Sequence, residues 1–177
     1  MKLEGSRTQA NLMAAYAGES QASVKYRIYA AQAKKDGYEQ MAQIFETTSL
    51  NEKAHAQIWF EYLHSGSVPG TPDNLRDAAA GEHFEWSDMY PKFAETAREE
   101  GFIDIANRME LIAGIEKTHE ERYDRLGCEV KNAEVFQKKG PVQWVCRYCG
   151  YVHTGEKAPM ACPVCKQPQA YFEEKKD

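Results

Sequence analysis

Two Glu-x-x-His pairs, Glu52-x-x-His55 and Glu116-x-x-His119, are the residues in this sequence with the clearest chemical potential. Residues three apart on a helix share a face, so each pair would present a carboxylate beside an imidazole. Both pairs fall where apolar residues recur every three or four positions, as on the buried face of an amphipathic helix. A buried carboxylate is costly unless it is paired, hydrogen-bonded or bound to metal. The pairs are therefore candidate metal ligands.

Three further glutamates, Glu19, Glu82 and Glu85, fall on the apolar faces of other predicted helices, without Lys or Arg beside them. Glu82 and Glu85 would be like charges on one face, which is unfavourable unless a cation lies between them. Carboxylate oxygen and imidazole nitrogen together suit iron or manganese, with zinc as a further option. One such pair alone would more often be an ordinary buried polar contact, but the full set predicts a di-metal carboxylate site in a helical bundle.

Three residues near these glutamates lie outside this set of expected ligands. Tyr26 and Tyr90 lie one or two helical turns away, and two readings stay open: plain core aromatics, or hydroxyls that hydrogen-bond metal-bound carboxylates. His83 follows Glu82 directly, about 100° further around a helix, and is expected at the surface.

Four of the five cysteines form two C-x-x-C pairs, Cys146 with Cys149 and Cys162 with Cys165. Such pairs in a reducing compartment are more often metal ligands than disulfides, and four thiolates bind iron or zinc. Their spacing does not choose between the two metals. The predicted di-metal site favours iron, because a metal pair that turns over needs a source of single electrons. Cys128 lies outside both pairs and is expected to be a bystander thiol.

The elements that must position these residues are helices. The apolar periodicity predicts four, over residues 7–35, 38–64, 73–100 and 102–126, with Gly37 and Gly101 ending the first and third. The long Pro- and Gly-containing connection 65–74 joins two short-looped hairpins. Two antiparallel hairpins joined by a crossover are typical of a four-helix bundle.

The two hairpins repeat each other in sequence. Ala17-Gly18-Glu19 recurs as Ala80-Gly81-Glu82 at an offset of 63 residues, whereas Glu52-x-x-His55 recurs at an offset of 64. The sequence therefore predicts one added residue in the third helix, near Pro91, which should also kink that helix. Glu85 breaks the symmetry, because its counterpart in the first hairpin is Ala22.

The remaining features bound the domains and the class of protein. Residues 1–126 are expected to form the bundle, 127–140 a linker, and 141–177 a small domain that is too short for an apolar core and needs a metal. The net charge of −5 and the lack of a basic cluster argue against nucleic acid as a partner. No stretch suggests a signal peptide or a membrane helix, so a cytoplasmic protein is expected.

The ordered set of glutamates, histidines and paired cysteines resembles the rubrerythrins over essentially the whole chain. The resemblance implies a mainly α fold: a ferritin-like di-iron four-helix bundle followed by a small rubredoxin-like β domain. It also implies an oxo- and carboxylate-bridged di-iron centre and one mononuclear iron held by the four cysteines. The implied ligands of the di-iron centre are Glu19, Glu52, Glu82, Glu85, Glu116 and His119, with Glu52 and Glu116 bridging. By the same resemblance, His55 replaces Glu85 on one iron in the reduced state, and Tyr26 and Tyr90 hydrogen-bond the ligands.

The function implied by the resemblance is the reduction of hydrogen peroxide to water, as protection against oxidative stress. The implied electron donors are an NAD(P)H-dependent reductase and often a separate rubredoxin, and the implied assembly is a homodimer or higher homo-oligomer. Two alternatives stay open: a ferritin-like ferroxidase that handles iron, and a structural zinc protein with an inert bundle. Electron input from a fused thiolate-bound iron argues against the ferroxidase, which does not need re-reduction by a protein donor.

Overall fold

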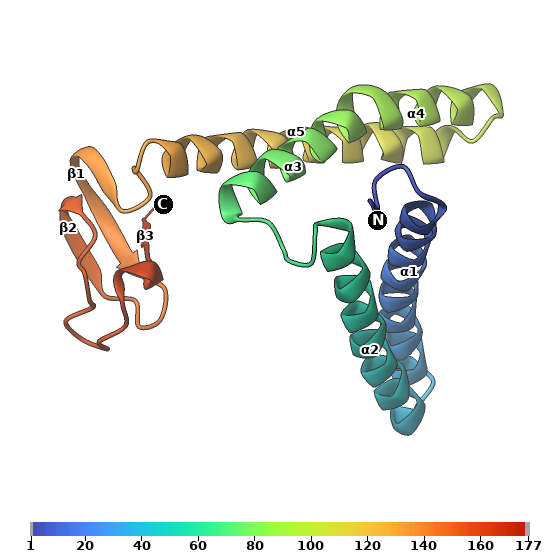
Figure 1. Ribbon diagram of the computed structural model, residues 1–177, viewed down its shortest axis with the longest axis horizontal. Helices are drawn as coiled ribbons and strands as arrows, with labels where there is room; N and C mark the ends of the chain where they lie inside the picture. Colours follow the sequence, from blue (N-terminus) through green and yellow to red (C-terminus); the bar gives the residue numbers. More distant parts are fainter. Residues whose placement is uncertain (1, 176–177) are drawn as a thin grey trace. The chain divides into compact units, whose positions relative to one another are not determined.

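The computed structural model of the chain describes residues 2–175. The chain divides into two compact units between Pro69 and Gly70. The first unit is a helical hairpin, and the second is another helical hairpin followed by a small sheet (Figure 1). The predicted fold class, mainly helical with a small C-terminal β domain, is confirmed.

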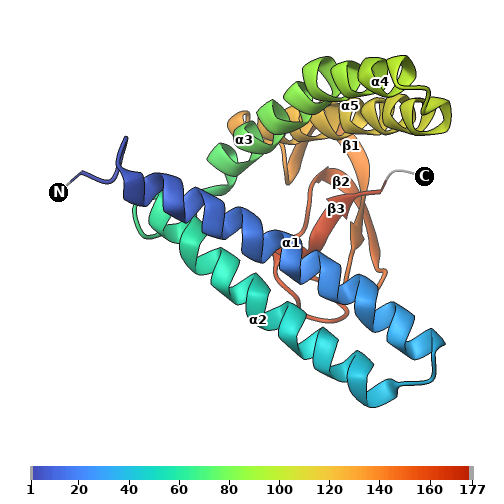
Figure 2. The same cartoon turned by 90° about the vertical axis from the view of Figure 1, so that its right-hand side faces the viewer.

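The first hairpin consists of α1 (Arg7–Lys35) and α2 (Glu39–Leu63), which run side by side (Figures 1 and 2). Ser6 caps α1 by accepting a hydrogen bond from the backbone N–H of Gln9 at 3.1 Å. Gly37, at φ 82°, forms the turn between the two helices, a conformation that favours glycine. Small buried residues along the contact, including Ala30 and Ala42, let the two helix backbones approach closely.

The second hairpin consists of α3 (Thr71–Phe84), a π-helical turn η1 (Glu85–Met89), α4 (Tyr90–Glu99) and α5 (Ile103–Lys131). Gly101, at φ 86°, forms its turn, as Gly37 does in the first hairpin. Ala94, Ala97 and Ala106 form the buried contact between α4 and α5. The two turns support the duplication that the sequence predicts.

The π-helical turn accounts for the change in repeat offset. The backbone N–H of Tyr90 bonds to the carbonyl oxygen of Glu85, five residues back rather than four, so this turn contains one extra residue. It comes directly before Pro91, which has no N–H to donate within a helix. The added residue expected near Pro91 is therefore accommodated in residues 85–89, and the single helix expected over 73–100 is divided into three segments.

The small domain is an antiparallel sheet with strand order β2-β1-β3, formed by β1 (Gln137–Cys146), β2 (Val152–Lys157) and β3 (Phe172–Glu174). A short 3-10 helix, η2 (Gln169–Tyr171), precedes β3. Trp144 lies at the centre of the core, and its indole N–H donates to the carbonyl oxygen of Gly155 at 2.9 Å. The fully buried residues of this core are Trp144, Cys146, Ala158, Cys162 and Phe172. Two of the five are thiols of the predicted metal site, which agrees with a domain that depends on metal.

The junction between the helices and the sheet is more structured than the sequence indicates. The helix expected to end at residue 126 continues to Lys131, and β1 already begins at Gln137. The glycine at position 127 does not end the helix, because a helix interior tolerates an isolated glycine at a cost of about 1 kcal/mol. Lys138 pairs with Glu129 of α5 at 3.4 Å and with Glu174 of β3 at 3.5 Å. The domain boundaries drawn from the sequence stay predictions.

Among residues 2–175, no helix combines the length and the apolar character that a bilayer-spanning segment needs.

Candidate metal centres

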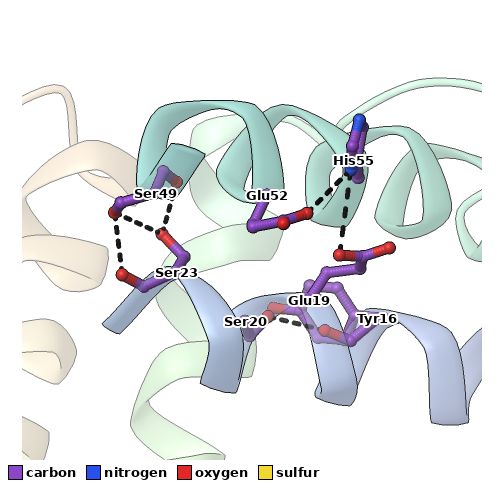
Figure 3. A network of polar contacts seen from close by, with 7 residues as sticks. All are labelled: Tyr16, Glu19, Ser20, Ser23, Ser49, Glu52 and His55. Carbon is purple, nitrogen blue, oxygen red and sulfur yellow. Dashed lines mark hydrogen bonds and ion pairs between the residues drawn. The ribbon is translucent and has the colours of Figure 1, made fainter. Parts of the chain in front are cut away.

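The first hairpin brings Glu19 of α1 together with Glu52 and His55 of α2. His55 Nδ1 lies 3.0 Å from a carboxylate oxygen of Glu52 and 3.8 Å from one of Glu19 (Figure 3). One donor atom from each of the three residues lies within 4.8 Å of the other two. We call these three residues the first triad.

The second hairpin repeats this arrangement with Glu82 of α3 and with Glu116 and His119 of α5. His119 Nδ1 lies 2.7 Å from Glu116 and 3.6 Å from Glu82. Their donor atoms also lie within 4.8 Å of one another, and these three residues form the second triad.

Both triads fit iron by the chemistry of their donors. Two carboxylates and one imidazole form a donor set that binds iron in proteins, whereas structural zinc sites draw mainly on cysteine and histidine. Within residues 2–175, the four triad glutamates pair with the two histidines rather than with Lys or Arg. A metal cation would supply the missing positive charge.

Glu85 and Tyr90 lie close to the second triad. Burial raises the pKa of Glu82, and the negative charges of Glu116 and Glu85 raise it further, while His119 opposes them. Burial also raises the pKa of Tyr90, followed by the charges of Glu85, Glu116 and Glu82. Glu85 itself lies outside the group of donor atoms within 4.8 Å of one another. The second hairpin therefore concentrates negative charge that a bound cation would neutralise.

The two tyrosines differ in their surroundings. Tyr26 packs against Phe45 and Tyr29, with ring centroids 6.1 and 6.2 Å apart. Tyr90, in contrast, is close enough to the carboxylates of the second triad for their charges to raise its pKa. The contacts of Tyr26 are those of a core aromatic, and its predicted hydrogen bond to a ligand stays a prediction.

Each hairpin also has a polar link between its helices that the sequence did not reveal. In the first, Ser23 Oγ donates to the carbonyl of Ser49 at 2.9 Å, and Ser49 Oγ donates to that of Ser23 at 2.7 Å (Figure 3). In the second, Glu120 of α5 accepts from His83 and from the indole N–H of Trp86. The bond from Trp86 lowers the pKa of Glu120, with burial opposing and His83 reinforcing the shift.

A sequence signal for the second link did exist. His83 and Trp86 are three residues apart and so share a helix face. Glu120 directly follows the candidate ligand His119, as His83 directly follows the candidate ligand Glu82. His83 is exposed, as expected, yet it is hydrogen-bonded. Sequence reasoning missed the link because a hydrogen bond between two helices depends on their register.

The four paired cysteines converge in the small domain. Cys146 Sγ lies 3.7 Å from Cys165 Sγ, and Cys149 Sγ lies 3.6 Å from Cys162 Sγ. All four sulfur atoms lie within 4.8 Å of one another, the arrangement expected for a tetrahedral four-thiolate site. Cys128 is exposed and does not belong to this group.

Similar backbone turns form the two cysteine knuckles. The N–H of Gly150 donates to the carbonyl of Cys146 at 2.8 Å, and the N–H of Lys166 donates to that of Cys162 at 3.0 Å. Gly150 has φ 76° and Lys166 has φ 65°, so both turns use the left-handed conformation. Glycine adopts this conformation without strain, whereas Lys166 adopts it at a steric cost.

The thiols of this site do not ionise alike without a metal. Burial opposes ionisation of Cys162, but backbone N–H groups of Cys165 and Val164 lower its pKa to about 7. Burial, together with the neighbouring thiols, raises the pKa of Cys165 to about 12, against an opposing hydrogen bond from the backbone N–H of Gln167. A metal ion would stabilise all four as thiolates, so these residues fit a mononuclear iron.

Comparison with known proteins agrees with both kinds of site. The rubrerythrin family model matches residues 10–127, and the model of the rubredoxin-like domain of rubrerythrin matches residues 144–173. A rubrerythrin of Porphyromonas gingivalis is 47% identical over 97% of this chain and 91% of its own length. Rubrerythrin-1 of Clostridium acetobutylicum is 44% identical, and the rubrerythrin of Nitratidesulfovibrio vulgaris 43%, each over 97% of this chain and 95% of the relative.

The cofactors predicted from the sequence are thus supported by the residues that would hold them and by the relatives. They are a di-iron carboxylate centre and a four-cysteine iron centre. The rubredoxin-like domain indicates electron transfer. With matches over nearly its full length, the chain belongs to the rubrerythrin family of oxidative-stress iron proteins and, with it, to the oxidoreductases.

Proposed function

We propose that the protein reduces hydrogen peroxide to water at the di-iron centre, with electrons that enter through the four-cysteine iron. The reaction takes up two electrons and two protons for each peroxide and yields two molecules of water. The observation that carries the proposal is the presence, in one chain, of carboxylate–histidine triads and a four-thiolate site. Iron in a carboxylate-rich centre supplies the two electrons, and iron held by four thiolates passes electrons one at a time.

We assign the ligands as the family resemblance implies. Those of the di-iron centre are Glu19, Glu52, Glu82, Glu85, Glu116 and His119, with Glu52 and Glu116 bridging. Those of the mononuclear iron are Cys146, Cys149, Cys162 and Cys165. The triads support this assignment, because their glutamates have no other cationic partner than histidine in the described part of the chain.

His55 is assigned as the residue that replaces Glu85 on one iron in the reduced state. Its support is geometric: His55 lies against Glu52 as His119 lies against Glu116, so its imidazole is equally able to reach a metal bound by its own triad. An imidazole carries no negative charge, whereas Glu85 does. The exchange would therefore match the ligand charge to the lower charge of the reduced centre.

Tyr90 is assigned to hydrogen-bond the ligand carboxylates. Because burial and three nearby carboxylates raise its pKa, its hydroxyl stays protonated at neutral pH and can donate to an acceptor that carries negative charge. We assign the same role to Tyr26 from the resemblance, with its aromatic packing holding the ring in place.

The proposed partners are an NAD(P)H-dependent reductase, a rubredoxin, or both, in the cytoplasm. Tyr148 and Val164 support docking of a donor protein, because both lie within the cysteine knuckles and each is 65% exposed. A homodimer or higher homo-oligomer is proposed because each hairpin exposes large apolar side chains, such as Ile28 in the first and Leu111 in the second.

Anaerobic mixing of the fully reduced protein with one equivalent of peroxide tests the proposal directly. We expect peroxide to oxidise the di-iron centre faster than oxygen does, in a protein that contains three irons per chain. Cys146→Ser is the matched control, because it should preserve a single oxidation by peroxide but prevent repeated turnover with an external donor. Oxidation by peroxide that is no faster than by oxygen would refute the proposal.

The same samples distinguish the alternatives. A ferroxidase would consume added Fe(II) and accumulate iron well beyond three ions per chain. Stoichiometric zinc in both kinds of site would indicate a structural zinc protein instead.

A further inference from the structure

A carboxylate of α5 holds two side chains of the helix opposite in the second hairpin. One oxygen of Glu120 lies 2.9 Å from His83 Nδ1, and the other accepts the indole N–H of Trp86. Both carboxylate oxygens are therefore used, although only 19% of the side chain is exposed. Because an ionised carboxylate only accepts hydrogen bonds, His83 must donate from Nδ1.

The three residues of this link are sequence neighbours of metal ligands. His83 follows Glu82, Trp86 follows Glu85, and Glu120 follows His119. Neighbouring residues on a helix point about 100° apart, so the link lies on the face next to the ligands and does not occupy the metal site. It therefore joins the backbone segments that carry ligands on α3, η1 and α5 without competing for the metal.

The indole of Trp86 is held by more than its hydrogen bond. The His83 ring meets it edge-on at a centroid distance of 5.3 Å, and Lys117 Nζ lies 5.3 Å from its centroid. Lys117 is itself the neighbour of Glu116. A ring with an edge contact, a cation contact and a charged acceptor has little rotational freedom.

The link coincides with the π-helical turn that carries Glu85. Trp86 belongs to this turn, whose bond from Tyr90 N–H to Glu85 O spans five residues. In the first hairpin, the counterparts of Trp86 and Glu120 by repeat offset are Ser23 and Ala56, so the link cannot form there. That hairpin also has an uninterrupted helix and no fifth carboxylate.

We propose that Glu120 is a positioning residue, whose hydrogen bonds to Trp86 and His83 fix the π-helical turn and thereby aim Glu85 at the metal centre. The inference rests on the proposed role of Glu85 as an iron ligand. It assigns Glu120 no contact with iron or peroxide.

The test compares Glu120→Ala with Glu120→Gln and with Glu110→Ala. The glutamine oxygen can still accept from Trp86, so Glu120→Gln is the conservative rescue. Glu110 is the matched control, because it also joins two helices of this hairpin, through Arg98 at 2.7 Å, but away from the triad.

Two measurements report on positioning rather than on stability. In the metal-free protein, Glu120→Ala should shift the indole N–H resonance of Trp86 and speed amide exchange at Tyr90 by about tenfold or more, because a charged hydrogen bond is lost. In the iron-loaded protein, it should shift the midpoint potential of the di-iron centre. Glu120→Gln should remain close to wild type in both, and Glu110→Ala should change neither.

The proposal is overturned if Glu120→Ala lowers only the melting temperature and matches Glu110→Ala in amide exchange and potential. If the alanine variant does not fold, Trp86→Phe keeps the ring but removes the donor, and it should speed exchange at Tyr90 in the same way. Unchanged exchange in Trp86→Phe would also overturn the proposal. Because the exchange measurement uses metal-free protein, failure of the peroxidase reaction would leave this result intact.

Discussion

The two hairpins hold their imidazoles at nearly the same distances from their glutamates. These distances are 3.0 and 3.8 Å in the first triad and 2.7 and 3.6 Å in the second. In both hairpins, one glutamate comes from the first helix, and the Glu-x-x-His pair comes from the last. The duplication has thus kept the geometry of the donors.

The surroundings of the triads have diverged. The first hairpin links its helices through Ser23 and Ser49, two small residues inside a close helix contact. The second has a π-helical turn, the additional carboxylate Glu85, and the link from Trp86 to Glu120. One additional residue and a few substitutions therefore make the surroundings of two similar donor sets unequal.

The largest expected effect comes from removing the carboxylate nearest to each imidazole. Glu52→Ala and Glu116→Ala should each lower the affinity for Fe(II) by more than about 100-fold. Removing a residue that only hydrogen-bonds a metal ligand already costs about 10- to 100-fold, and removing a ligand itself should cost more. Glu52→Ala should lose more affinity, because it leaves the first hairpin with Glu19 and His55. Glu116→Ala leaves the second hairpin with three donors, Glu82, Glu85 and His119. Anaerobic Fe(II) titration measures both affinities, and equal losses would show that Glu85 does not compensate.

The next effect concerns Glu85 itself. Glu85→Ala should preserve the helical content and most iron binding but slow peroxide reduction by about tenfold or more, because the oxidised, more positive centre loses a stabilising charge. Stopped-flow oxidation by peroxide and the midpoint potential measure the change, and the potential should rise.

Ala22→Glu provides the reciprocal variant, since it adds the fifth carboxylate to the first hairpin. If the asymmetry matters, Ala22→Glu combined with Glu85→Ala should not restore the wild-type rate, because the first hairpin lacks the π-helical turn. An unaltered rate in Glu85→Ala alone would contradict the role of this residue.

These comparisons show what the sequence could predict. The triads could be located because helical periodicity and repeat spacing determine which residues share a face, and the cysteine site could be located because two C-x-x-C knuckles need a common metal. The extra residue in the third helix was also visible, as a change of offset. Its conversion into a π-helical turn was not, since the choice between a kink and a wider turn depends on how α3 and α4 pack against α5.

The contacts between helices were the part that sequence reasoning could not reach. The shared helix face of His83 and Trp86 was visible in the sequence. Their pairing with Glu120 was not, nor was that of Ser23 with Ser49, because such pairs depend on the axial register of two helices. The end of α5 was predicted at residue 126, five residues before its observed end at Lys131. The linker was expected to begin at residue 127, but α5 continues to Lys131, and Glu129 near its end pairs with Lys138 of β1.

A smaller effect should appear in the metal-free protein. The pKa of Glu82 in the folded chain is raised above 4.5, so the carboxyl contributes its full stability below the pKa of the unfolded chain and loses it as the pH rises through the folded pKa. Glu82→Gln should therefore raise the melting temperature of the metal-free protein at pH 7 by about 2 °C. The difference should vanish near pH 4.

The matched variant for this comparison is Glu19→Gln. It should raise the melting temperature less, because Ala22 stands where the second hairpin has Glu85. Calorimetry at both pH values measures the two variants. A gain for Glu82→Gln that persists at pH 4 would mean that the effect is not electrostatic.

The smallest expected effect separates the two interhelical links. Ser49→Ala removes the hydroxyl that donates to the Ser23 carbonyl at 2.7 Å and should lower the free energy of unfolding by about 1 kcal/mol. Ser20→Ala is the control, because among residues 2–175 its hydroxyl bonds within α1, to the carbonyl of Tyr16 at 2.7 Å. Denaturant unfolding measures both. Ser49→Ala should leave the di-iron potential unchanged, whereas Glu120→Ala should shift it. The reason is that the second hairpin carries the additional carboxylate Glu85 beside its link, and the first hairpin has Ala22 at that position. A shift in potential from Ser49→Ala would show that the first hairpin also positions its ligands through this contact.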